Sequence, residues 1–316
     1  MVTQPIRVSD EVRSALADGR PVVALESTIF THGLPRPRNL EVALEGEAIA
    51  RDNGAVPATI GVYRGQAVVG LSPSEIEELA GSDGLLKASI RELAYARVHS
   101  LSAGTTIAAT AYLANRVGID VFATGGLGGV HHGASTTFDE SADLVALAKT
   151  SFLLVSSGAK AILDIGATLE RFETLSVPVV GYRTNNYPGF YVADSGYTVN
   201  QRVDTPEQAA DLLLTQRALG IEAGINLANP VPVDEQLDTE GFDAILERAW
   251  ADAERDGISG QATTPYLLDY IRRATDGRSL DANVALYRNN VRLASAVAGA
   301  LAARAAEAAG AAGEEQ

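Results

Sequence analysis

Short apolar segments alternate with amphipathic helical patterns along most of this 316-residue chain. The apolar segments resemble buried strands: PVVAL, IDVFAT, SFLLVSS, VPVVGYRT and AGINLANP. Helical patterns lie between them, among them RNLEVALEGEAIARDNG, SADLVALAKT and TPEQAADLLLTQRALG. This alternation predicts an α/β sheet with helices on its faces. The segment VPATIGVYRGQAVVGLS, with a turn at Arg64 and Gly65, predicts a hairpin, so we expect a mixed sheet.

No Pro- or Ser-rich linker divides the sequence, and we expect a single domain over residues 1–316. A first helix is expected within residues 1–20. Two further helical patterns are SPSEIEELAG and KASIRELAYARV, and the second of these begins at Lys87. The Ala-rich segment 303–316 is expected to be a helix that frays into a tail.

Composition excludes several classes of function. The chain has no cysteine, which removes disulfides, thiolate metal sites and cysteine nucleophiles. Its net charge of −15 argues against nucleic acid as the partner, because phosphate binding needs concentrated Lys and Arg. No apolar run is long enough for a membrane span, and the N-terminus lacks the pattern of a secretory signal. A cytoplasmic location is therefore expected.

Glu26 directly follows the predicted strand PVVAL, in the segment ALESTIFTHGLP. Open α/β sheets build their binding crevices at this end of their strands. A carboxyl group there can act as a general acid, particularly if burial raises its pKa. The segment alone also allows an ordinary loop glutamate with its hydrogen bonds satisfied.

A glycine-rich turn, ATGGLGGVHHG, follows the strand IDVFAT. Its glycine spacing fits neither a P-loop nor a dinucleotide fingerprint, so nucleotide binding gains no support. The glycines with His131 and His132 indicate backbone close to a ligand, although a purely structural turn explains them equally well.

The segment TTFDESADLVALAK gathers acidic residues and serine at the start of a predicted helix. Such residues are favoured there as caps. They also allow a sharper interpretation, in which Asp139 holds Mg²⁺ or Mn²⁺ and Ser141 receives a phosphate at the helix start. The segment SAGTTIAAT, up to Ile107, provides a second helix start of the same type.

The chain has 22 arginines and only three lysines, at positions 87, 149 and 160. Arginine serves for surface charge, but it cannot form a Schiff base. Lys160 is expected to open a helix, where the helix dipole and apolar neighbours favour the neutral amine that attacks carbonyls. Lys149 is expected at a helix end, where a cation needs no special role, so the scarcity of lysine alone leaves the function of Lys160 open.

Several motifs in one order resemble a single family. They are ALESTIFTHGLP, KASIRELA, TTIAAT, TGGLGGVHHGA, FDESADL, SSGAKAILD, GYRTNNYPGFY and SLDANVALYRNN. These motifs look like those of pseudouridine-5'-phosphate glycosidases, the indigoidine-synthase-A-like group, and they cover residues 20 to 300. His132 and Ser135 stand where relatives often carry other polar or charged residues.

The resemblance implies a single-domain α/β/α enzyme that uses Mn²⁺ and assembles as a homotrimer. It implies reversible conversion of pseudouridine 5'-phosphate to uracil and ribose 5-phosphate. Lys160 would be the covalent nucleophile, Glu26 the proton donor and Asp139 the metal ligand. The substrate contacts that it implies are Lys87, Ile107, Ser141, Ala142, Asp143, His131 and Asn283.

The chemistry explains why such an enzyme would use an amine. Ordinary glycosidases expel an oxygen with the help of two carboxyl groups. Pseudouridine joins C1' of ribose to C5 of uracil, so the leaving atom is carbon, and an imine at Lys160 would provide the electron sink. The alternatives are an O- or N-glycosidase that pairs Glu26 with Asp139 or Asp143, a Schiff-base aldolase, and a non-catalytic sugar-phosphate-binding protein.

Overall fold

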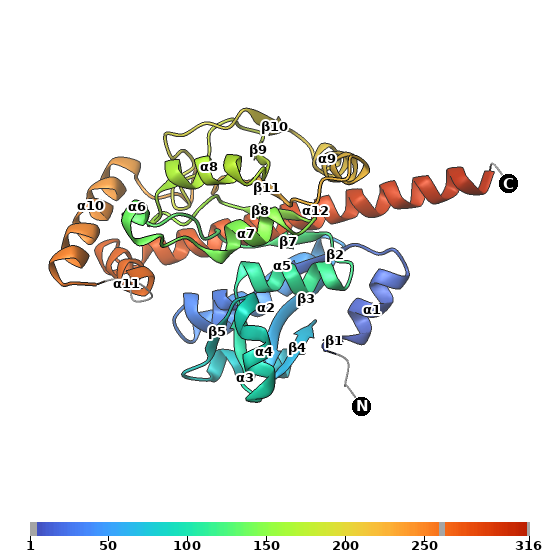
Figure 1. The fold of residues 1–316 in the computed structure, drawn as a ribbon, viewed down its shortest axis with the longest axis horizontal. Helices are drawn as coiled ribbons and strands as arrows, with labels where there is room; N and C mark the ends of the chain where they lie inside the picture. The colour runs from blue at the N-terminus through green and yellow to red at the C-terminus, as the bar shows by residue number, and fades with distance from the viewer. Residues whose placement is uncertain (1–4, 259–262, 315–316) are drawn as a thin grey trace.

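The structure is a computed structural model that describes residues 5–258 and 263–314. Within these ranges, 11 strands form one sheet with helices packed around it (Figure 1). The strand order is β1-β4-β3-β2-β7-β8-β11-β9-β10, with β6 paired to β3 and β5 paired to β6. The strands are β1 (Ile6–Val8), β2 (Val22–Leu25), β3 (Val56–Tyr63), β4 (Gln66–Val69), β5 (Leu86–Ala88), β6 (Ala103–Thr105), β7 (Val121–Ala123), β8 (Leu153–Ser156), β9 (Val179–Tyr182), β10 (Gln201–Val203) and β11 (Ile225–Ala228).

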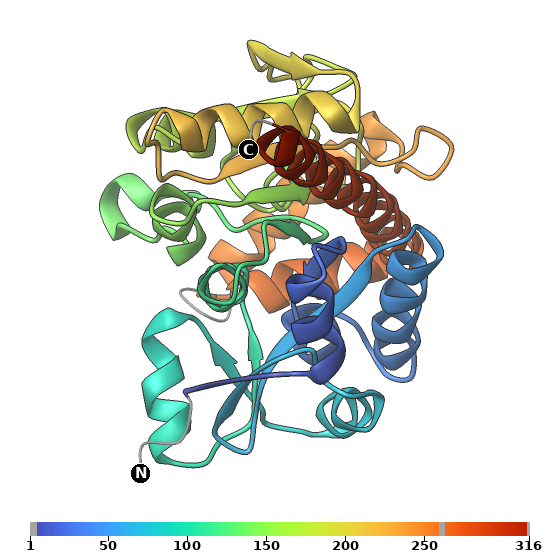
Figure 2. The ribbon, with the colours of Figure 1, turned by 90° about the vertical axis from the view of Figure 1, so that its right-hand side faces the viewer.

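Strand β3 joins two parts of the sheet. Its first half pairs in parallel with β2, and its second half pairs antiparallel with both β4 and β6. Figure 2 shows the N-terminal part of the chain, in blue and teal, at the lower end of the molecule and the green-to-yellow part at the upper end. The expected hairpin is confirmed: Arg64 and Gly65 link β3 to β4 with φ of 48° and 79°, the conformation that tight two-residue hairpin turns require. The mixed sheet is therefore confirmed.

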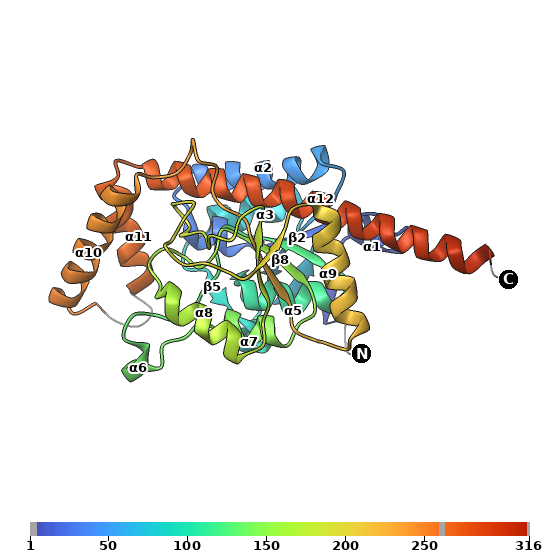
Figure 3. The same ribbon diagram turned by 90° about the horizontal axis from the view of Figure 1, so that it is seen from above.

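Helices cover both faces of the sheet (Figure 3). Helices α2 and α12 lie along one side, and α5, α7 and α8 lie along the other, so the α/β/α arrangement is confirmed. No helix of the described residues is long and apolar enough to cross a membrane. The helices are α1 (Asp10–Ala17), the π-helix η1 (Ile29–Gly33), α2 (Arg38–Asp52), α3 (Pro73–Gly81), α4 (Ile90–Val98), α5 (Ile107–Arg116), α6 (Ala134–Thr137), α7 (Ala142–Ala148), α8 (Ile165–Thr174), α9 (Pro206–Ala218), α10 (Thr239–Arg255), α11 (Thr263–Ala274) and α12 (Arg278–Glu314).

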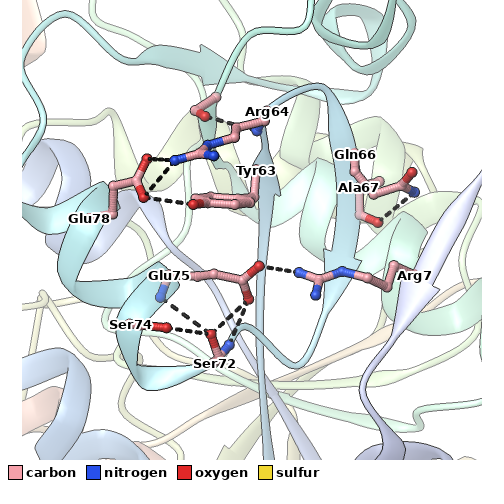
Figure 4. A network of polar contacts seen from close by, with 10 residues as sticks. Arg7, Tyr63, Arg64, Gln66, Ala67, Ser72, Ser74, Glu75 and Glu78 are labelled. Atoms are coloured by element: carbon pink, nitrogen blue, oxygen red, sulfur yellow. Dashed lines mark hydrogen bonds and ion pairs between the residues drawn. The ribbon is translucent and has the colours of Figure 1, made fainter.

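Surface polar contacts fix α3 against the β3–β4 hairpin (Figure 4). Ser72 and Glu75 form a reciprocal capping box at the start of α3, and Glu75 also pairs with Arg7 of β1. Near the other end of the helix, Glu78 accepts hydrogen bonds from Tyr63 (2.6 Å) and Arg64 (3.1 Å). Because these groups are largely exposed, each contact contributes little to the free energy of unfolding. Their main effect is to set the orientation of α3.

Two expected helix starts are wrong, and both concern lysines. Lys87 lies in strand β5, and the helix that it was expected to begin starts at Ile90. Lys160 lies in the loop after β8, and α8 starts only at Ile165. Lys149, by contrast, caps the C-terminal end of α7 as expected.

Helices were expected near both ends of the chain, and both are present. The expected N-terminal helix corresponds to α1, while residues 1–4 lie outside the described residues. Helix α12 continues through the Ala-rich segment as far as Glu314, where fraying was expected from about residue 303. Residues 315–316 lie outside the described residues.

Candidate active site

Glu26 lies at the carboxyl end of β2, on the expected edge of the sheet. In the parallel pairing of β2 with β7, Leu25 is the partner of Ala123, so the next residues, Glu26 and Thr124, leave the sheet side by side. The two carboxylate oxygens of Glu26 accept hydrogen bonds from the hydroxyls of Thr28 and Thr124. Glu26 is only 6% exposed, so this carboxyl group is held in a fixed and nearly dry position.

The surroundings of Glu26 suit an acid that holds its proton. Burial raises the pKa of Glu26, because an ionised carboxylate loses hydration inside the protein. The positive charge of Lys160 and the two threonine hydroxyls act in the opposite direction, while Asp143 adds to the increase. Lys160 and Glu26 therefore lie within electrostatic range of each other, as an amine and an acid of one site must.

The backbone holds Lys160 firmly although it lies in a loop. Its N–H donates to the carbonyl oxygen of Leu127 at 3.0 Å, and the N–H of Ala159 donates to the buried hydroxyl of Tyr187 at 2.9 Å. Lys160 itself is half-buried. Because Asp164 caps α8 four residues later, the expected effect of a helix N-terminus on the amine does not apply. Neighbouring charges and partial burial define its environment instead.

Lys87 reaches the same site from the other part of the sheet. It lies in β5, paired with Gly104 of β6, and it remains exposed to solvent. Desolvation by the surrounding protein lowers the pKa of Lys87, the charge of Lys160 lowers it further, and Glu26 opposes both. Next to it lies His32, whose ring contacts the carbonyl oxygen of Leu85 at 3.1 Å. Burial, reinforced by the charge of Lys87, lowers the pKa of His32.

Asp143 joins two loops of the site. One of its carboxylate oxygens accepts the N–H of Ala108 at 3.0 Å, and the other accepts the N–H of Gly128 at 2.9 Å. Asp143 is buried, and its own N–H donates to Ser141, the N-cap of α7. It therefore ties the start of α5 to the glycine-rich turn.

The other residues near these helix starts differ in exposure. Ile107, the first residue of α5, has a buried side chain, and N–H groups in the first turn of a helix lack intrahelical partners. This fits the expectation that Ile107 acts through its backbone. Ala142 is exposed and Ser141 is half-buried at the start of α7.

The glycine-rich turn has a structural explanation. An ideal Cβ on Gly126 would lie 2.4 Å from the ring of Phe190, and one on Gly128 would lie 2.3 Å from Oγ of Ser141. Both distances are shorter than real Cβ contacts, so a larger residue at either position would force the neighbouring side chains to move. Asn283 of α12 approaches the same turn, with Oδ1 3.3 Å from the Cβ position of Gly125. The turn therefore lets neighbouring side chains close on the site, as the structural interpretation of its sequence required.

His131 and Asp139 close the base of the loop that carries α6. The N–H of His131 donates to the backbone oxygen of Asp139 at 3.0 Å, and the Asp139 carboxylate has no hydrogen bond or ion pair among the described residues. Burial lowers the pKa of His131, Asp139 opposes this, and Lys160 and Lys87 contribute smaller decreases. His131 therefore lies within electrostatic range of both lysines of the site. His132 turns away and packs edge-on against Trp250 of α10, with ring centroids 4.9 Å apart.

The residues of the site could bind a divalent cation only with the help of water and substrate oxygens. No group of three or more His, Asp or Glu that could hold a metal occurs in the part of the chain that the structure describes. Mg²⁺ and Mn²⁺ are commonly bound by one or two carboxylates together with water and substrate phosphate. The Asp139 carboxylate, which has no hydrogen bond or ion pair within the described ranges, suits that mode and not a closed protein cage.

Three supporting residues escaped the sequence analysis. Thr28 and Thr124 hold Glu26, and no pattern of residue types marks them. Asn290 of α12 is buried and donates to the carbonyl oxygens of Thr124 (2.8 Å) and Gly125 (3.2 Å). Its side-chain oxygen accepts a hydrogen bond from Asn229 at 2.9 Å. The motif SLDANVALYRNN contains both Asn289 and Asn290, and nothing in it distinguishes one from the other.

A buried acid at a strand end of an α/β/α sheet, with a half-buried lysine in the loop after a further strand, is an arrangement that suits an enzyme with a carboxyl group and an amine in one site. The chain belongs to the indigoidine synthase A like protein family, whose profile matches residues 11–300.

Named relatives are similar over nearly the whole chain. A pseudouridine-5'-phosphate glycosidase of Saccharopolyspora erythraea is 59% identical over 295 residues, covering 93% of this chain and 97% of that protein. Another, of Salinispora tropica, is 51% identical and covers 96% and 94% of the two chains.

Solved structures agree with this placement. The prealnumycin C-glycosynthase AlnA, in complex with ribulose 5-phosphate, superposes with a TM-score of 0.90 at 38% identity, covering 96% of this chain and 99% of AlnA. An indigoidine synthase A-like protein of Thermotoga maritima superposes with a TM-score of 0.85 at 36% identity, covering 94% and 96%.

Proposed function

We propose that this chain is a pseudouridine-5'-phosphate glycosidase, which reversibly cleaves the C1'–C5 bond of pseudouridine 5'-phosphate to give uracil and ribose 5-phosphate. The observation that carries the proposal is that the buried Glu26 carboxyl, at the end of β2, lies within electrostatic range of Lys160, in the loop after β8. The names of relatives at 51–59% identity support the same substrate.

The first chemical stage joins the sugar to Lys160. The neutral amine forms a bond to C1', and the C1'–O4' bond breaks, with its electron pair and a proton going to O4'. The ring is then open and C1' carries both the lysine nitrogen and C5 of uracil. An amine is required because this nitrogen has a lone pair to give in the next stage.

The second stage breaks the carbon–carbon bond. The nitrogen lone pair forms C1'=N as the electron pair of the C1'–C5 bond moves to C5, and C5 takes the proton of Glu26. Uracil leaves, and Glu26 is now a carboxylate. Water then adds to the imine, which restores the amine of Lys160 and releases ribose 5-phosphate. Burial keeps Glu26 protonated over a wider pH range than an exposed glutamate, as a proton donor needs.

The remaining site residues would bind the substrate. Lys87 is a solvent-accessible cation beside Lys160 and suits the phosphate group, while His131 and Asn283 border the glycine-rich turn. Ile107, through its backbone, and the segment 141–143 complete the proposed contacts. Asp139 would hold one Mn²⁺, which supplies positive charge to phosphate oxygens when bound. Assembly as a homotrimer and a cytoplasmic location are further parts of this proposal.

Trapping of the imine tests the proposal. Borohydride added during turnover with ribose 5-phosphate and uracil should reduce C1'=N, and peptide mass spectrometry should locate one added ribose phosphate on Lys160. Lys160→Arg should abolish both the label and uracil release, whereas Lys149→Arg, at the end of α7, is the matched control and should retain both. Uracil release by Lys160→Arg would refute the imine at Lys160, and a wild-type chain that releases no uracil would refute the glycosidase function. Labelling of Lys87 alone would exchange the roles of the two lysines.

A further inference from the structure

Each oxygen of the Glu26 carboxyl group is held by a different threonine. The hydroxyl of Thr28 donates to Oε2 and the hydroxyl of Thr124 donates to Oε1. Thr124 is completely buried and Thr28 is 8% exposed, and neither hydroxyl has another hydrogen-bond partner among the described residues. Thr28 precedes the π-helix η1 but its side chain does not cap that helix. Both hydroxyls therefore serve Glu26 alone.

Two hydroxyl donors stabilise a carboxylate, whereas burial destabilises it. A proton donor in a reversible reaction needs both forms, because cleavage uses the acid and bond formation uses the carboxylate. Buried without donors, Glu26 would keep its proton and could not take one from C5 of uracil. The two threonines therefore stabilise the carboxylate against burial, and bond formation between uracil and ribose 5-phosphate requires that carboxylate.

We propose that Thr28 and Thr124 are positioning residues that fix the plane of the Glu26 carboxyl group and keep its acid and carboxylate forms interchangeable. The inference rests on the proposed function, since it concerns the proton donor of that reaction. In this proposal the two threonine hydroxyls stabilise the ionised form of Glu26 against the effect of burial. The positive charges of Lys160 and Lys87 stabilise it further.

Other ionisable groups around Glu26 are few and identifiable. Lys160 from the loop after β8 and Lys87 from β5 favour the carboxylate, while Asp143 from α7 disfavours it. Tyr287 of α12 lies within electrostatic range of Glu26, and burial keeps its hydroxyl neutral by raising its pKa. Because the threonine variants leave all four groups in place, a change in the titration of Glu26 reports the lost hydrogen bond.

The direct test is the titration of Glu26 in the unliganded protein. Infrared or ¹³C spectroscopy monitors the carboxyl group, and the Glu26 signal is identified because it is absent from Glu26→Gln. Thr124→Val and Thr28→Val keep the side-chain shape and remove one donor each. A hydrogen bond to a charged group shifts such an equilibrium by about one to two pH units, so each variant should titrate higher by that amount. Thr124→Ser should restore the wild-type midpoint.

A second buried Thr–Glu pair supplies the control. Thr59 donates to Glu47 at 2.6 Å, and Glu47 likewise has a pKa raised by burial, but the pair lies between β3 and α2, outside the site. Thr59→Val should lower the melting temperature without moving the Glu26 midpoint. Folding of every variant is checked by circular dichroism. An unmoved midpoint in folded Thr124→Val and Thr28→Val, or an equal shift in Thr59→Val, would overturn the inference.

Kinetics connect the titration to the reaction. Thr124→Val should lower kcat in the synthetic direction more than in cleavage, with KM for ribose 5-phosphate unchanged and activity recovered in Thr124→Ser. A purely structural role would lower both directions equally, and that result would count against the inference. If the wild-type chain releases no uracil, the proposed function fails, while the spectroscopic midpoints still decide whether the threonines control the proton affinity of Glu26.

Discussion

Replacing Asp143 with asparagine should destabilise the protein although the two side chains have nearly the same shape. The carboxylate accepts the N–H of Ala108 at 3.0 Å and the N–H of Gly128 at 2.9 Å, inside the protein. Asparagine has one oxygen and one NH₂ group, so it can accept only one of these donors. Its NH₂ group would face the other N–H, which would then be buried without a partner.

The size of the effect follows from these two contacts. The retained bond loses its ionic character, which costs about 1 kcal/mol, and the orphaned N–H costs about 1–3 kcal/mol. We therefore expect the free energy of unfolding of Asp143→Asn to fall by about 2–4 kcal/mol. For a chain of this size, that corresponds to a decrease in melting temperature of roughly 3–6 °C.

Urea unfolding followed by circular dichroism measures this change, with the melting temperature as a second readout. Asp139→Asn is the matched control, because the Asp139 carboxylate lies four residues away without a hydrogen bond or ion pair in the described ranges. It should change stability by less than about 0.5 kcal/mol. If Asp143→Asn unfolds at the same urea concentration as the wild type, Asp143 does not join the two loops and the reasoning from its hydrogen bonds is wrong.

Three further predictions concern Glu26 and Asp139. Glu26→Gln keeps the shape but gives no proton, so uracil release should fall by about 10²–10⁴-fold, and near-normal release would exclude Glu26 as the donor. Because burial raises the pKa of Glu26 above its usual 4.5, the wild type should lose stability as pH rises beyond that value. The melting temperature of Glu26→Gln relative to wild type should therefore increase from pH 4 to pH 8, and a constant difference would contradict this. EDTA should suppress uracil release by the wild type, and Mn²⁺ should restore it. Mn²⁺ should restore far less activity in Asp139→Asn. Full activity in EDTA would exclude the metal.

The sequence predicted the sheet, the hairpin and the main helices because periodic patterns and turn residues act locally. It placed Glu26 correctly at a strand end for the same reason. The start of α4 could also have been found: Ser89 and Glu92 form a capping box three residues apart, which marks Ile90 as the first helical residue. The helical pattern of residue types extends back to Lys87, but Lys87 pairs with Gly104 in a short parallel strand.

Contacts made across the sheet could not be predicted in this way. Thr124 meets Glu26 because Leu25 and Ala123 are partners in the β2–β7 register, and a single sequence does not state that register. Lys160 was assigned to a helix start because the apolar residues after it suit a helix. The chain instead makes a turn there, with Asp164 as the true cap of α8.

Helix α12 has a consequence for how the protein is made on the ribosome. Asn290 of this helix donates to the carbonyl oxygen of Thr124, 166 residues earlier in the chain. At typical synthesis rates the backbone beside Glu26 must wait roughly 10–30 s for this partner. During that interval the apolar face of β2, β7 and β8 that α12 covers remains open to other nascent chains. The nascent chain therefore acquires its active site only near the end of translation, and its greatest need for chaperones falls just before that point.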